Sequence, residues 1–140
     1  MIGVVIVTHG RLAEELYLAL VHVVGPQEAF ARVCVAADDS LDERRAEIAA
    51  RIAEVDSGSG VIVITDMFGG TPCNLAVSLM SRENMEVISG ANLPMLVKLA
   101  KLRGILPLPE VSRHIQEAGR KYIGAASDCF PMCRVRALRG

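Results

Sequence analysis

The chain has 140 residues, of which 51% are hydrophobic, so its length and composition fit one compact domain with a substantial core. Fifteen Lys and Arg residues against 16 Asp and Glu residues give a formal net charge of −1, which excludes an overall field that attracts nucleic acid or an anionic membrane. No run reaches the roughly 20 apolar residues of a membrane span, and the N-terminal apolar run lacks the marks of a signal peptide. We therefore expect a cytoplasmic protein with no direct membrane insertion.

Four short runs rich in valine and isoleucine predict β-strands. They are 2–7 (IGVVIV), 31–36 (ARVCVA), 60–65 (GVIVIT) and 85–90 (MEVISG). The runs are apolar almost throughout, whereas a half-exposed strand alternates apolar and polar residues. This pattern is typical of strands that are buried on both faces.

Amphipathic patterns predict helices between and after these strands, over 11–24, 41–54, 72–82, 94–103 and 109–120. Strand and helix in strict alternation indicate a doubly wound α/β domain, with a mainly parallel sheet of four strands and helices on both faces. We assign this domain to residues 1–125. In the segment 126–140 the periodicity stops and three arginines appear, so we predict a basic, loosely ordered C-terminal tail there.

A histidine follows the first predicted strand without any spacer. His9 lies between Thr8 and Gly10, where the strand ends and a helical pattern begins. Ligands of doubly wound sheets bind outside the carboxyl ends of the strands, and a neighbouring glycine lets a partner approach the backbone closely. We therefore predict a functional role for His9, while His22 and His114, which lie within helical patterns, are expected to be structural.

The loop after the third predicted strand, 66–72 (DMFGGTP), lies at the same edge of the sheet. Thr71 is expected as an N-cap and Pro72 as the first helical residue, which would create a helix start where an anion can bind. Asp66 can accept a hydrogen bond from one imidazole nitrogen and leave the other nitrogen as nucleophile or base. The alternative is that Asp66 only shapes a turn.

The cysteines predict neither a metal site nor a redox site. Their positions are 34, 73, 129 and 133, a spacing that matches neither a zinc ligand set nor a CxxC motif. We expect free thiols, no metal and no cofactor.

Three segments together resemble the IIA component of the mannose family of the bacterial sugar phosphotransferase system (PTS). They are 5–16 (VIVTHGRLAEEL), 61–76 (VIVITDMFGGTPCNLA) and 87–99 (VISGANLPMLVKL), in the order and spacing of that family. The resemblance covers residues 1–125. It implies a histidine phosphocarrier that takes a phosphoryl group from the protein HPr and passes it to a IIB component for sugar uptake, or reports the phosphorylation state of the PTS to a regulator.

The resemblance also implies roles for particular residues. The phosphorylated histidine falls on His9, the orienting aspartate on Asp66 and the hydroxyl of the glycine-rich loop on Thr71. It further implies a homodimer in which an antiparallel strand near the C-terminus is exchanged, and we attach this strand to residues 121–127.

Phosphoryl transfer between two imidazoles needs in-line positioning and stabilisation of the phosphoryl oxygens. We expect these from backbone N–H groups around Gly10 and Gly70 and from the hydroxyls of Thr8 or Thr71. An apolar rim around His9 suits docking of a carrier protein, with core packing as the alternative for the last two of its members. The rim consists of Met67, Phe68, Leu93 and Met95.

Other classes fit the residues less well. A response-regulator receiver needs an acidic pair after the first strand, where this chain has Thr8 and His9, and a histidine phosphatase needs an arginine at the position of Thr8. No GxGxxG or P-loop motif follows any strand, which argues against a nucleotide site. The phosphoryl-donor subunit of dihydroxyacetone kinase and a non-enzymatic doubly wound signalling domain remain as alternatives.

Overall fold

The computed structural model describes residues 1–81 and 83–129. Four strands form one sheet: β1 (Gly3–His9), β2 (Phe30–Val35), β3 (Val61–Thr65) and β4 (Met85–Ser89). The helices are α1 (Leu12–Val24), α2 (Leu41–Val55), α3 (Thr71–Ser78), α4 (Leu93–Leu102), α5 (Leu108–Lys121) and α6 (Ala126–Cys129). This arrangement confirms the predicted α/β class.

The sheet is parallel, with the strand order β2-β1-β3-β4. The chain steps outward from β1 to β2 and then crosses back over β1 to β3, so the order reverses between β1 and β3. In doubly wound folds this switch point is where the crevice for ligands opens at the carboxyl edge. His9 ends β1 and Asp66 follows β3, so both residues lie at this point.

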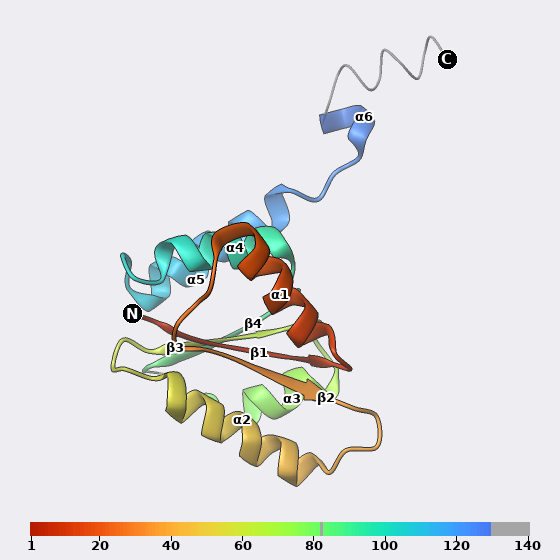
Figure 1. Ribbon diagram of the computed structural model, residues 1–140, viewed down its shortest axis with the longest axis vertical. Helices are drawn as coiled ribbons and strands as arrows, with labels where there is room; N and C mark the ends of the chain where they lie inside the picture. Colours follow the sequence, from red (N-terminus) through yellow and green to blue (C-terminus); the bar gives the residue numbers. More distant parts are fainter. Residues whose placement is uncertain (82, 130–140) are drawn as a thin grey trace.

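Helices cover both faces of the sheet (Figure 1), as the continuous apolar strands require. Helices α1, α4 and α5 pack on one face, and α2 and α3 pack on the other. Alternate β1 residues supply the two cores: Val4 and Ile6 belong to the first, Val5 and Val7 to the second. All four side chains are fully buried, which explains why this strand is apolar along its whole length.

Helix α3 is shorter than predicted, because it ends at Ser78. The N–H groups of Leu79 and Met80 bond to carbonyls three residues back, which tightens and closes the last turn. Helices α1, α2, α4 and α5 agree with the prediction to within one residue at each end, whereas α6 was not predicted.

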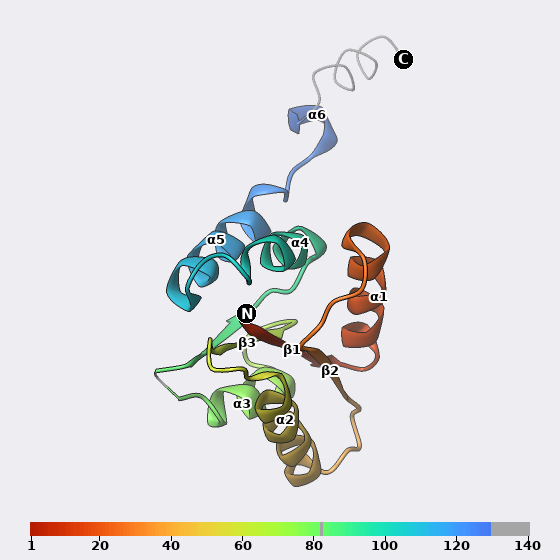
Figure 2. The ribbon, with the colours of Figure 1, turned by 60° about the vertical axis from the view of Figure 1, so that its left-hand side comes forward.

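The strand expected over 121–127 is not formed in the described part of the chain. Residue 121 ends α5, residues 122–125 form a turn and an irregular segment, and α6 follows. Figure 2 shows this segment leading away from the sheet of its own chain, so it pairs with no strand there. Its exchange onto the sheet of a second copy stays a prediction. Of the predicted basic tail, residues 130–140 with all three arginines lie outside the described residues.

Among the described residues, no helix combines the length and the apolar character that a membrane span requires.

Candidate active site

His9 and Asp66 form the centre of the site. Oδ2 of Asp66 accepts two hydrogen bonds from His9, one from Nδ1 of the ring at 2.8 Å and one from the backbone N–H at 3.0 Å. Because a carboxylate only accepts, we assign the ring proton to Nδ1. Nε2 then carries the lone pair that is available for chemistry.

Asp66 is held as a carboxylate by its surroundings. Burial alone would raise the pKa of its carboxyl, but hydrogen bonds from the ring and backbone of His9 and the attraction of that ring outweigh this effect. The net result is a pKa below the ordinary value. The side chain of Asp66 is only 14% exposed, whereas that of His9 is 50% exposed, so a shielded carboxylate orients an accessible imidazole.

The start of helix α3 faces the ring of His9. A Cβ built on Gly70 would lie 2.6 Å from Cε1 and 3.1 Å from Nε2 of His9, so only a glycine lets this backbone come so close. Gly70 is also the N-cap of α3, and therefore no side chain caps the first turn. The unpaired N–H groups and the positive end of the helix dipole favour an anion at such a terminus.

The sequence placed the start of α3 one residue too late. Thr71 is the first helical residue and Pro72 the second, while Gly70, with extended φ and ψ angles, takes the N-cap position. The hydroxyl of a serine or threonine at the N-cap accepts a hydrogen bond from a backbone N–H in the first turn of its own helix. Thr71, in contrast, keeps its hydroxyl at the helix start without this capping role.

Thr8 and Gly10 do not present free groups to the site. The Thr8 side chain is fully buried, and its Oγ1 accepts a hydrogen bond of 2.6 Å from the backbone N–H of Ala13 in the first turn of α1. The N–H of Gly10 donates to the carbonyl of Val35 at 2.8 Å. Gly10 has a φ of 53°, so it serves the turn between β1 and α1.

The predicted apolar rim is only partly at the surface. Met67 and Phe68, which follow Asp66 in the loop before α3, are exposed, with Phe68 at 72%. Leu93 is half-buried and packs against the core at the start of α4. Met95 differs from the prediction, because it is 4% exposed and belongs to the core.

The described residues offer no metal-binding cluster of three or more His, Cys, Asp or Glu side chains. Cys34 and Cys73 are free thiols, and Cys73 is buried in the first turn of α3. Its Sγ accepts a hydrogen bond from Oγ of Ser89 at 3.3 Å. The side chain of Cys129 and all of Cys133 lie outside the described residues.

The family model EIIA-man, described as the PTS system fructose IIA component, matches residues 3–116. The chain belongs to this family. This match confirms the resemblance on which the sequence prediction rests, and it covers both His9 and the α3 loop.

Two known PTS components are similar in sequence to most of this chain. The mannose-specific EIIAB component of Escherichia coli K12 is 32% identical over 126 residues, which make up 89% of this chain and 39% of that protein. The chain thus spans well under half of that relative. The fructose-specific EIIA component of Bacillus subtilis is 23% identical over 129 residues, 91% of this chain and 88% of that protein.

Solved structures agree on the fold. The PTS component EIIA of Streptococcus agalactiae has a TM-score of 0.84 at 25% identity, covering 92% of this chain and 100% of that chain. The mannose/sorbose-specific IIA subunit of Enterococcus faecalis has a TM-score of 0.79 at 28% identity, covering 89% and 93% of the two chains. The chain is therefore a PTS EIIA component of the mannose/fructose/sorbose type.

Proposed function

We propose that this EIIA-man protein is a histidine phosphocarrier. Nε2 of His9 takes a phosphoryl group from phospho-HPr and passes it to a IIB component for sugar uptake, or holds it as a signal that a regulator reads. The observation that carries the proposal is the accessible Nε2 beside the start of α3, with Nδ1 of the same ring held by Asp66.

The chemistry needs no metal and no external base. The P–N bond of the HPr phosphohistidine breaks as a new P–N bond forms on Nε2, and the proton on Nδ1 stays on the ring. Positive charge develops on the imidazole during this step, and Asp66, 2.8 Å from Nδ1, stabilises it. Transfer to the acceptor is the same step in reverse, so the ring has to be positioned but not deprotonated.

The phosphoryl oxygens are bound by the start of α3 in this proposal. The free backbone N–H groups at this helix start and the hydroxyl of Thr71 would bind them; the approach of the Gly70 backbone to the His9 ring supports this role. Gly10 contributes through the shape of its turn. Thr8 is left out of the phosphate contacts, because its hydroxyl is buried against α1.

In this proposal partner proteins dock over the exposed side chains of Met67 and Phe68 and over the half-buried Leu93 at the start of α4. Aromatic and methionine side chains are enriched at protein interfaces. We also propose a homodimer. β4 is an edge strand, and a groove of about 370 Å³ runs along residues 86–90, which supports strand addition there by a second copy.

Phosphorylation in a reconstituted system tests the proposal. Incubation with enzyme I, HPr and phosphoenolpyruvate should add one phosphate per chain, seen by intact-protein mass spectrometry. The bond should be labile in acid and stable in base, as a phosphoramidate is. His9→Ala should abolish the label, and His22→Ala and His114→Ala serve as matched controls that keep it. Labelling of His9→Ala, or no label with HPr present, would disprove the proposal.

A further inference from the structure

All three lysines of the chain gather at one place on its surface. The 15 Lys and Arg residues include only Lys98, Lys101 and Lys121 as lysines. Lys98 and Lys101 line a groove of about 320 Å³, and Lys98 and Lys121 line an adjoining hollow of about 140 Å³. We call these two connected depressions the lysine groove.

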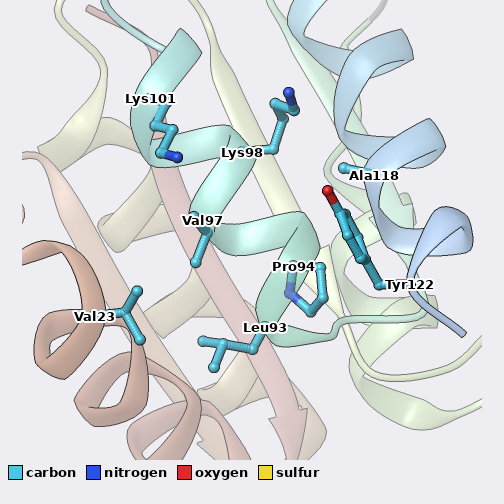
Figure 3. A pocket seen from close by; sticks show the side chains of 8 residues that line it. All are labelled: Val23, Leu93, Pro94, Val97, Lys98, Lys101, Ala118 and Tyr122. Atoms are coloured by element: carbon cyan, nitrogen blue, oxygen red, sulfur yellow. The ribbon is translucent and has the colours of Figure 1, made fainter. Parts of the chain in front are cut away.

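The lysine groove is apolar along its floor. Figure 3 shows α4 as the floor, with Val23 of α1 on one side and Tyr122, just after α5, on the other. Leu93 and Val97 of α4 lie between them. Val23 and Tyr122 are 54% and 66% exposed, so these walls present apolar and aromatic surface to solvent.

The positive charges along the groove have no acidic partners of their own. In the described part of the chain, neither Lys98 nor Lys101 forms an ion pair, and Nζ of Lys121 lies 5.6 Å from the centre of the Tyr122 ring. Elsewhere the carboxylates are used by arginines, as in the pairs Arg44–Glu47, Arg51–Glu54 and Arg113–Glu117. Glu117 borders the adjoining hollow but is paired with Arg113.

We propose that the lysine groove docks an acidic amphipathic helix of a partner protein. The apolar face of that helix packs on Leu93, Val97 and the walls, and its carboxylates pair with the lysines. Helix α4 has 10 residues and so offers about 15 Å of floor, roughly three turns. A groove between α1 and the end of α5, with α4 as its floor, suits a helix, which recognises such surfaces through residues spaced three and four apart.

Charge decides between the possible occupants. The chain's own residues 130–140 contain arginines and no acidic residue, so the lysines would repel them. Of the four acidic residues of helix α2, three are paired with arginines of the same helix, namely Glu43, Glu47 and Glu54, which argues against a second copy. An acidic partner helix is the occupant that satisfies both the apolar floor and the unpaired ammonium groups. Docking here does not depend on phosphoryl transfer to His9.

The placement of the lysines makes the test specific. Reductive methylation with ¹³C-formaldehyde keeps the positive charge and labels only the three lysines and the α-amine of Met1, which lies at a different hollow. The probe is a synthetic helix of about 18 residues with leucine on one face and glutamate beside it. The control peptide has the same sequence with lysine in place of each glutamate. The acidic helix should shift all three lysine signals in a saturable way and leave the Met1 signal unchanged.

Variants complete the test. The double change Lys98→Gln with Lys101→Gln should weaken binding of the fluorescently labelled acidic helix by about fivefold, since it removes two exposed ion pairs that are each individually weak. Arg45→Gln should bind as the wild type does, because Arg45 belongs to α2, which covers the other face of the sheet. Both variants should be phosphorylated like wild type, which separates this site from His9. Equal binding of the acidic and basic helices, unmoved lysine signals, or full binding by the double variant would overturn the proposal.

Discussion

The backbone of Gly70 lies against the imidazole of His9, and a single added carbon would displace the ring. A Cβ on Gly70 would come within 2.6 Å of Cε1 of His9. The φ and ψ angles of Gly70 are −85° and 162°, which any L-amino acid adopts. Contact with His9, and not backbone strain, therefore explains why this position needs a glycine.

Gly70→Ala should leave the fold intact and slow phosphorylation of His9. The new methyl group pushes the ring out of line with the start of α3, and a displacement of about 1 Å costs roughly 10²-fold in rate. The measurement is the initial rate of HPr-dependent labelling, with circular dichroism to confirm folding. Gly69→Ala is the matched control, because its φ of 82° makes alanine strained while its Cβ would contact nothing within 4 Å. Gly69→Ala should lower the stability of the fold but keep a higher labelling rate than Gly70→Ala. The reverse ranking would contradict this role for Gly70.

Asp66→Asn should give a folded protein that accepts phosphate slowly. Asparagine keeps the shape but can donate from its amide, which favours the wrong tautomer of His9 and removes the charge that stabilises the ring. We expect the rate of transfer from phospho-HPr to fall by at least ~10²-fold. Rapid-quench measurement of the labelled fraction checks this. Kinetics equal to those of the wild type would remove Asp66 from the mechanism.

The contribution of Asp66 to stability should vanish in acid. Its pKa in the folded protein is lowered, so its stabilising effect is complete above the ordinary carboxyl pKa of about 4 and is lost as the pH falls through the folded-state pKa. Urea unfolding of wild type and Asp66→Asn at several pH values measures the difference in free energy of unfolding. This difference should be largest near neutrality and shrink below about pH 4. A constant difference across this range would rule out the pKa shift as its source.

Arg103→Met should destabilise the domain at the end opposite to His9. Arg103 is 2% exposed, and its guanidinium donates to the carbonyls of Ile2 at 2.9 Å and Ala29 at 2.7 Å. Removing it takes a donor from the buried Ile2 carbonyl and from the half-buried Ala29 carbonyl, which still accepts from the N–H of Val4, at a cost of about 1–3 kcal/mol. Arg113→Met is the control: its exposed pair with Glu117 contributes well under about 1 kcal/mol. Urea unfolding compares the two variants, and equal stability would show that Arg103 is not needed to join these segments.

Local composition determined the fold class of this protein. Strands such as β1, with the run VVIV, are buried on both faces, so their residues are apolar without alternation. Parallel strands that alternate with amphipathic helices can form few folds other than a sheet with helices on both faces. The same rule brought His9 and Asp66 to one edge of the sheet, because parallel strands end on the same side. These inferences needed no knowledge of side-chain contacts, and the family match agrees with them.

Packing decided the details that sequence patterns do not contain. Which nitrogen of His9 meets Asp66, and whether Thr8 faces the site or caps α1, depend on the directions of side chains at the ends of strands. Met95 was predicted at the rim but lies in the core, because α5 covers its side of α4.

The lysine groove and the absent strand depend on tertiary structure for the same reason. Lys98 and Lys121 are far apart in the chain and meet only because α4 packs against α5. A strand over 121–127 requires a strand edge to bond with, and in the described chain this segment leads away from its own sheet. Only a second copy could supply such an edge, so this strand depends on assembly as well. Periodicity reports which face of an element is buried, whereas these features depend on which other element lies against it.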